Sequence, residues 1–156
     1  MPLEAGRTKF SLKGVTAGRF YSDEVLSVSA VPNAQLTGDV SKIRFGEEPN
    51  SGQAWSYILE AEGKRVGFSG DISGSLKGRA MDHLLGQEFD LLVMEMTHIH
   101  PRDVLPAVGR GKIGRLVLIH IHDPWHGEGE EELAGYCGEH LPFPFTIAHD
   151  GMALDL

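Results

Sequence analysis

Two nearly uninterrupted apolar stretches, residues 89–94 and 116–121, constrain the fold more than any other feature of the chain. A strand that is covered on both faces is apolar along its length, whereas a half-exposed strand alternates. Polar residues and then a segment with helical periodicity follow each stretch. Buried strands that alternate with helices predict a layered α/β domain.

The remaining segments complete a single domain, expected over residues 1–156. The expected strands are residues 9–15, 24–31, 55–60, 65–69 and 145–148, with 152–154 closing a last hairpin at Asp150-Gly151. Residues 55–60 and 65–69 form a hairpin around Glu62-Gly63-Lys64. The expected helices are residues 73–86, 101–108 and 130–140. This order predicts a mixed sheet with helices on one outer face. The long polar connection at residues 32–52 is of a kind that is often functional.

Composition narrows the class of protein. The 156 residues are 41% hydrophobic and 23% charged, as in a folded globular protein. The net charge of −8 does not favour a nucleic-acid partner, because phosphate contacts need Lys and Arg. No apolar run approaches the roughly 20 residues that span a bilayer. We expect a cytoplasmic protein with no membrane partner, in which the single Cys137 excludes an internal disulfide.

Side chains of the kinds that bind metals follow the predicted strands. They are Asp71 after the hairpin, Glu95 and His98 after residues 89–94, and His120 and His122 at the end of residues 116–121. Ligand sites in layered α/β proteins lie at the carboxyl ends of strands. Carboxylates and imidazoles at neighbouring strand ends would form a site for a divalent metal that activates water.

Each of these residues also has a structural interpretation. Asp71 could cap the following helix, and His120 could be a core histidine that binds a backbone carbonyl. His122 lies two residues beyond His120, on the same strand face if the strand continues. Glu95 ends a buried strand, where an ionised carboxylate needs a partner.

Taken in order, these segments resemble the C-terminal half of the metallo-β-lactamase superfamily of metal-dependent hydrolases. The hairpin that ends in Val66-Gly67-Phe68-Ser69-Gly70-Asp71 resembles the SGD motif of that family, whose Asp bridges two metal ions. Residues 90–95 resemble its DLLI-x-E strand, and residues 116–120 its LVLTH strand, whose His is the last metal ligand. The resemblance implies half of an αββα sandwich, with Asp71 as a catalytic metal ligand and His120 as a second ligand.

The chain also departs from the family pattern. The primary metal motif, H-x-H-x-D-H, is absent, so the resemblance implies a half-fold or a truncated domain. Gln35, or Asn33 if the register shifts, stands where the family has a further ligand His, and an amide is a weaker zinc ligand than an imidazole. We expect any further metal ligands, or residues that support the ligands, to be among His122, His98, Glu95 and Gln35.

Two functions are expected from this resemblance. The first is a hydrolase in which a divalent metal activates water against a small-molecule ester or a phosphodiester. Zinc is the expected metal, with manganese and iron as alternatives. The missing ligands would come from another chain or from sequence lost upstream. The second is a non-catalytic half-fold that associates with itself or with a partner chain. A half sandwich exposes an apolar sheet face, so we expect an oligomer or close pairing with a second chain.

Overall fold

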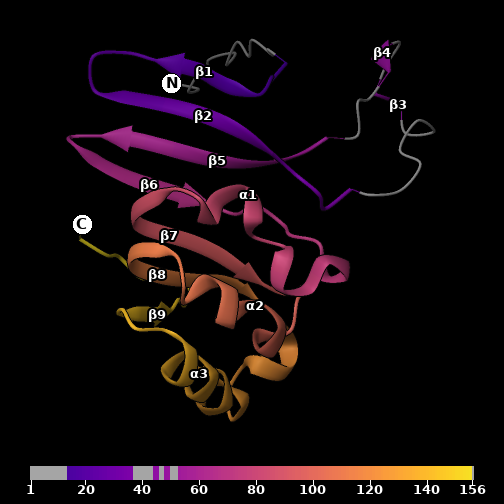
Figure 1. Cartoon of the computed structure of the whole chain (residues 1–156), viewed down its shortest axis with the longest axis vertical. Coiled ribbons are helices and arrows are strands. Elements are labelled where there is room, and N and C mark those ends of the chain that lie inside the picture. Colours follow the sequence, from indigo (N-terminus) through magenta and orange to yellow (C-terminus); the bar gives the residue numbers. More distant parts are fainter. Residues whose placement is uncertain (1–13, 37–43, 46–47, 50–52, 156) are drawn as a thin grey trace, which may run out of the picture.

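The computed structural model describes residues 14–36, 44–45, 48–49 and 53–155, and its largest element is a seven-stranded sheet (Figure 1). In spatial order the strands are β1 (Gly18–Ser22), β2 (Leu26–Asn33), β5 (Ala54–Ala61), β6 (Lys64–Phe68), β7 (Glu88–Met96), β8 (Lys112–Ile121) and β9 (Phe145–Ile147). Pairs from β1 to β6 are antiparallel, and those from β6 to β9 are parallel. A separate ribbon pairs β3 (Arg44–Phe45) with β4 (Glu48–Pro49). The mixed sheet is as predicted.

The hairpin of β5 and β6 lies where it was predicted, but its turn is the pair Glu62-Gly63 rather than three residues, because Lys64 already belongs to β6. Its register pairs Tyr57 with Phe68 and Ala61 with Lys64. Glu62 and Gly63 form the turn with φ angles of 50° and 75°. Two consecutive positive φ angles match the right-handed twist of paired strands. The hairpin therefore delivers the chain to residue 69 in a fixed register.

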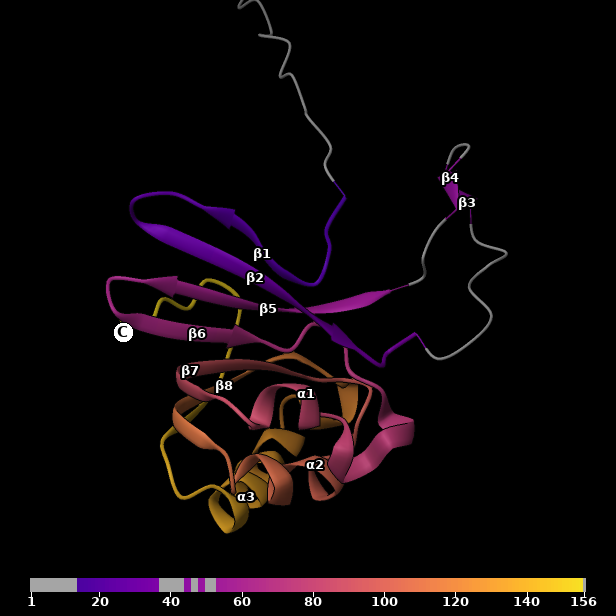
Figure 2. The same ribbon diagram turned by 45° about the horizontal axis from the view of Figure 1, so that its top comes forward.

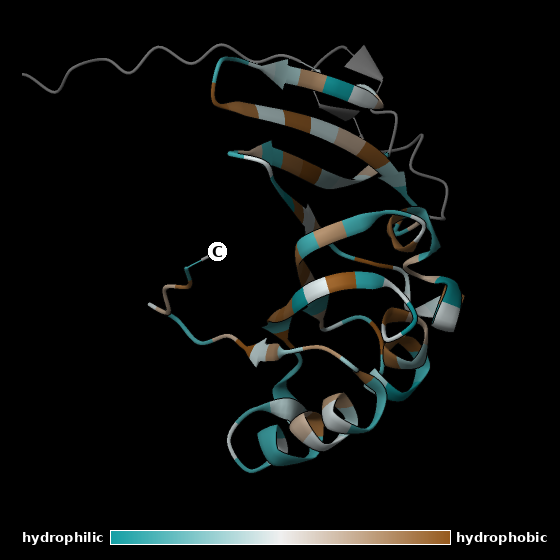
Figure 3. Ribbon diagram, turned by 60° about the vertical axis from the view of Figure 1, so that its left-hand side comes forward, coloured by the Kyte–Doolittle hydropathy of each residue, from teal (hydrophilic) through white to brown (hydrophobic). Residues whose placement is uncertain are grey.

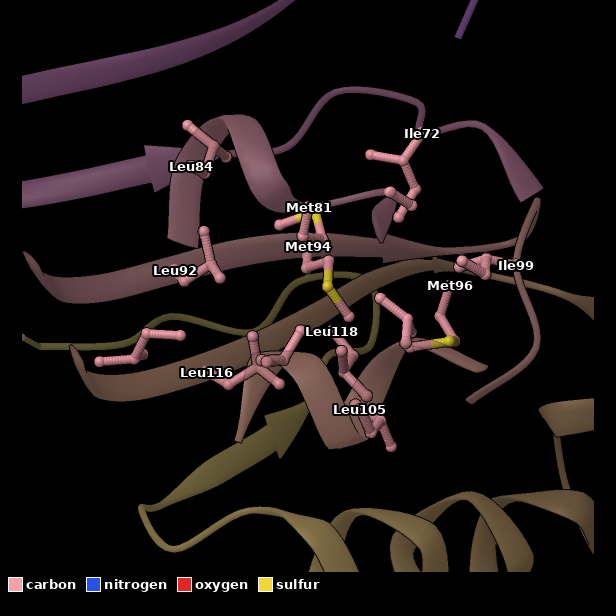
Figure 4. Close-up of a cluster of buried hydrophobic side chains, with 14 of the residues drawn as sticks. Ile72, Met81, Leu84, Leu92, Met94, Met96, Ile99, Leu105, Leu116 and Leu118 are labelled. Carbon is pink, nitrogen blue, oxygen red and sulfur yellow. The ribbon is translucent and has the colours of Figure 1, made fainter. Parts of the chain in front are cut away.

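The helices lie on one side of the sheet (Figure 2). They are α1 (Asp82–Leu85), α2 (Pro101–Val108) and α3 (Gly129–His140), with 3₁₀ segments η2 (Gly74–Arg79) and η3 (Asp123–Trp125). Between them and the sheet lies the main core, shown in Figure 4, which includes Leu92, Met94, Leu116 and Leu118 of the two central strands. The apolar stretches are thus strands, as predicted, but in the described part of the chain helices cover one of their faces rather than both.

The opposite side of the sheet, which we call the open face, carries a smaller apolar cluster. Leu91, Val93 and Val117 are buried there and pack against Val66 and Phe68. In the described part of the chain no helix covers this face (Figure 3). The prediction of helices on one outer face is therefore confirmed.

Three predicted elements differ from the structure. Residues 9–13 of the first predicted strand lie outside the described residues, and residues 14–15 are not in a strand. The edge strand is instead β1, which is mostly exposed and so lacks an apolar pattern. The helix predicted at 73–86 is divided into η2 and α1 by Lys77, whose φ is 47°. Glycines at 74 and 78 weaken a continuous helix there.

The last predicted hairpin is wrong. Asp150-Gly151 does form a turn, but residues 152–155 are not in a strand. Met152 and Leu154 stay exposed, so no packing holds this segment against the sheet. In the long connection of residues 32–52, β2 extends to Asn33, and most of the rest lies outside the described residues.

Candidate metal centre

Asp71, His98 and His120 meet at one edge of the sheet. They follow or end the strands β6, β7 and β8, which are adjacent and parallel, so their carboxyl ends share that edge. One ligand atom from each residue lies within 4.8 Å of the other two. Asp71 Oδ1 is 3.3 Å from His120 Nδ1, and both side chains are about half exposed. We call these three residues the Asp71–His98–His120 cluster.

A tight turn after β6 places Asp71. Gly70 has a φ of 58°, and a Cβ there would lie 2.5 Å from the carbonyl oxygen of Trp55. Asn33 Nδ2 is 3.2 Å from the carbonyl oxygens of Ser69 and Asp71, so the side chain at the end of β2 braces the turn. No helix begins at Asp71. The next helical segment starts at Gly74, which corrects the interpretation of Asp71 as a helix cap.

A buried polar network supports this turn from below. Ser56 is fully buried in β5, and its hydroxyl donates to the carbonyl of Ser69. The same hydroxyl oxygen is 3.2 Å from Asn33 Nδ2 and 2.7 Å from His83 Nε2. Burial lowers the pKa of His83. The sequence analysis missed this network, although a serine between Trp55 and Tyr57 on a covered strand is a signal that could have revealed it.

A β-bulge in β8 turns His120 out of the core. Glu95 pairs with Ile119 and Met96 with Ile121, so His120 is an extra residue between two regular pairs. Its φ of 46° lies in the left-handed region. Ile121 takes the place on the helix-covered face that His120 would otherwise have, and packs against the main core. His120 is therefore not a core histidine, and the bulge aims its side chain at the cluster.

The other predicted strand-end histidine, His122, is not part of the cluster. The expectation that His120 and His122 lie on one strand face is wrong. The strand β8 ends at Ile121, and the bulge at His120 interrupts the alternation of side chains before that point. The side chain of His122 is exposed, and its backbone N–H donates to the carbonyl of Met96 at 3.2 Å.

Glu95 is a buried carboxylate with a full set of partners. The side chain is 2% exposed. Its Oε1 accepts from the backbone N–H of Ile72 at 2.9 Å and lies 3.0 Å from His98 Nδ1. Its Oε2 accepts from the backbone N–H groups of Thr97 and His98. These contacts satisfy the expectation that Glu95 needs a partner, and they link the segment after Asp71 to the loop that carries His98.

Gln35 lies in the turn after β2. Its backbone N–H donates to Asn33 Oδ1 at 3.1 Å, which holds the amide of Asn33 toward the Asp71 turn. Asn33, rather than Gln35, is the residue of this segment that contacts the backbone of Asp71.

An apolar groove opens beside the cluster on the open face. Its volume is about 370 Å³, and the residues that line it are Tyr57, Leu59, Phe68, Ser69, Gly70, Asp71, Val93, Glu95, Ile119 and His120. Small-molecule sites are commonly concave and apolar, with a few polar groups at one point. Here the polar groups are at the end formed by Asp71 and His120.

The chain belongs to the β-lactamase superfamily: the model of the "Beta-lactamase superfamily domain" matches residues 6–121. No curated protein sequence matches this chain significantly. Solved structures share its fold. The metallo-β-lactamase fold protein YhfI from Bacillus subtilis superposes with a TM-score of 0.60 at 12% identity, over 85% of this chain and 49% of YhfI.

Two further structures show the same fold. Zn²⁺-bound PqqB from Methylobacterium extorquens has a TM-score of 0.53 and 21% identity, over 88% of this chain and 53% of PqqB. The short form of human tRNase Z has a TM-score of 0.51 and 17% identity, over 88% of this chain and 44% of tRNase Z. The chain thus spans about half the length of these three proteins. Among the described residues, no helix combines the length and the apolar character needed to cross a membrane.

Proposed function

We propose that this chain is a metal-dependent hydrolase that acts on an ester or a phosphodiester. The observation that carries the proposal is the apposition of Asp71 and His120, 3.3 Å apart, at the mouth of an apolar groove. A carboxylate beside an imidazole suits zinc, manganese and iron, and zinc fits this donor set best. When bound, such an ion supplies a water molecule of lowered pKa as the nucleophile.

The chain's own residues provide the surroundings that hydrolysis needs. Asp71 is held by a braced turn and His120 by a strand bulge, so both are fixed before any substrate arrives. Tyr57, Leu59 and Phe68 offer an apolar surface for the organic part of a substrate. The net charge of −8 favours a small substrate over a nucleic acid.

Metal analysis combined with a hydrolysis assay tests this proposal. Protein purified and then supplied with zinc, manganese or iron is expected to retain metal and to hydrolyse nitrophenyl esters or bis(nitrophenyl) phosphate. Asp71→Ala is expected to lower metal affinity by more than about 100-fold, because it removes a ligand rather than a supporting contact. Asp123→Ala, at an exposed position of η3, is the matched control and is expected to keep both properties. Metal-free protein with an intact fold would contradict the proposal.

A second candidate function rests on the open face. As the alternative to hydrolysis, we propose that a second copy of this chain covers that face, and with it the groove, in a non-catalytic assembly. Ile119 is 39% exposed, and Tyr57, Leu59 and Phe68 are only partly buried. The cluster of Leu91, Val93 and Val117 on this face is apolar, so its contact with a second copy would bury no charge. Two apolar sheet faces pack about 10 Å apart, as in a sandwich.

A further inference from the structure

His98 lies close to the two residues expected to bind the metal, although it comes from a different loop. It follows β7 by two residues and precedes α2, which begins at Pro101. Its ring is 5.6 Å from the ring of His120, with the planes at 73°. The side chain is 34% exposed, so part of the ring is open to solvent. His98 therefore completes the Asp71–His98–His120 cluster from the middle strand.

The backbone around His98 is held in place. Gly74 of η2 is so close that a Cβ there would lie 2.1 Å from the carbonyl oxygen of His98. The hydroxyl of Thr97 donates to the carbonyl of His120, which ties the loop to the bulge of β8. The two imidazoles are thus carried by segments that are bonded to each other.

Glu95 fixes which nitrogen of His98 is available. An ionised carboxylate only accepts hydrogen bonds, so its contact with His98 Nδ1 makes that nitrogen the donor. The lone pair of the neutral ring is then on Nε2. Metal-binding histidines typically donate their other ring N–H to a carboxylate or a carbonyl in this way. Glu95 is 2% exposed and is held by three backbone N–H groups, so it is a rigid acceptor.

We propose that His98 is the third protein ligand of the metal centre, through Nε2, and that Glu95 is its positioning residue. This inference rests on the proposed function. A carboxylate and two imidazoles are a complete protein ligand set for a catalytic zinc, which keeps a further position for water. The chain would then hold one metal ion with residues of its own, without Gln35 and without the absent H-x-H-x-D-H motif.

Titration of the full chain with Zn²⁺, followed by calorimetry, tests the ligand. His98→Ala is expected to weaken Zn²⁺ binding by more than about 100-fold, since a direct ligand is lost. His98→Gln is a second variant that keeps a polar side chain should the alanine variant fail to fold. The exposed neighbour His122→Ala is the matched control and is expected to bind Zn²⁺ as the wild type does.

Histidine ¹⁵N NMR gives a readout that a structural role would not produce. Zn²⁺ is expected to shift Nε2 of His98, while Nδ1 stays protonated. Glu95→Gln is expected to weaken Zn²⁺ binding by about 10- to 100-fold, the usual effect of losing a supporting carboxylate, and to disturb the Nδ1 resonance.

The outcomes separate the two proposals. Wild-type protein that binds no metal overturns both. If the wild type and both His98 variants bind Zn²⁺ with equal affinity, His98 is not a ligand and this inference is overturned. The proposed function is unaffected by that result. Equal losses in His98→Ala and His122→Ala also overturn it, and Glu95→Gln with unchanged affinity overturns the positioning role of Glu95.

Discussion

Beneath the turn that carries Asp71, the half-buried imidazole of His83 faces the hydroxyl of Ser56 at 2.7 Å. Ser56 in turn contacts Asn33 and Ser69, so His83 is the titratable member of the network that supports the turn. Because burial lowers the pKa of His83, the folded protein holds this ring neutral at a pH where the unfolded chain protonates it. Protonation of one residue is thereby coupled to folding.

This coupling predicts a pH dependence of stability. The unfolded chain binds more protons than the folded protein as pH falls below the ordinary histidine pKa of about 6.5. The stabilisation is therefore complete above that pH and is lost as pH falls toward the lowered pKa of folded His83. The free energy of unfolding should decrease with a slope of up to about 1.4 kcal/mol per pH unit from this residue. Urea denaturation between neutral and acidic pH measures it.

The contribution of His83 is isolated by a variant. His83→Gln keeps a polar group near Ser56 but cannot be protonated, so its unfolding free energy should depend less steeply on pH than that of the wild type. All other titratable groups are the same in the two proteins, so the difference between the two slopes isolates residue 83. Identical slopes for the two proteins would contradict the prediction.

At the scale of elements, the turn after β6 depends on Gly70. Its φ is 58°, and the space for a Cβ is occupied by the carbonyl oxygen of Trp55. Gly70→Ala is therefore expected to destabilise the fold by about 1–3 kcal/mol, because it adds backbone strain and a clash. The change is measured as a loss in the free energy of unfolding.

A second glycine substitution controls for the general effect of alanine. Gly135 lies in α3, where a Cβ would meet nothing within 4 Å. Gly135→Ala should stabilise the protein by up to about 1 kcal/mol, because alanine favours a helix. The free energy of unfolding is therefore expected to decrease for Gly70→Ala and to increase for Gly135→Ala. A Gly70→Ala variant as stable as the wild type would show that the turn can relax.

Strong local patterns were sufficient to predict several elements from the sequence. The stretches at 89–94 and 116–121 predicted β7 and β8 because both faces of these strands carry apolar side chains, in the main core on one side and in the small cluster of the open face on the other. The hairpin turn at Glu62-Gly63 was predicted by its turn residues. The edge strand β1 was not, because exposed strands carry no apolar pattern. The break at Lys77 depends on packing that a helical periodicity does not reveal.

The site could be predicted only in part. Asp71, Glu95, His98 and His120 were all found as polar residues at strand ends. Their grouping depends on the register shift at His120 and on the contact of Glu95 with Ile72, which lies 23 residues away in the sequence. Neither has a local sequence signal. His122 was a candidate ligand because the sequence does not reveal the bulge, which keeps His122 off the strand face of His120.

At the scale of the whole molecule, the described residues place helices on one side of the sheet only. Most of the largest buried side chains lie on the helix side, whereas the open face has a small cluster around Val93. Apolar faces that remain open favour association. The chain should therefore form a dimer through this face at micromolar concentration, as measured by sedimentation equilibrium.

A charge on the open face should oppose that association. Leu59→Lys places an ammonium in the groove and is expected to shift the protein toward the monomer. Val25→Lys is the matched control, because Val25 is 66% exposed and lies outside the residues that line the groove. A monomeric wild type, or equal dissociation by both variants, would contradict the assignment of this face.

Because of the bulge in β8, a mutation can remove a residue of the candidate site without disturbing the core. Loss of His120 alone would let Ile119 and Ile121 follow each other opposite Glu95 and Met96, so the strand would regain a regular ladder with every core side chain in place. The position of His120 beside Asp71 therefore depends on one inserted residue, whereas the packing of the core does not. In a strand built in this way, the geometry of the candidate site can change independently of the fold.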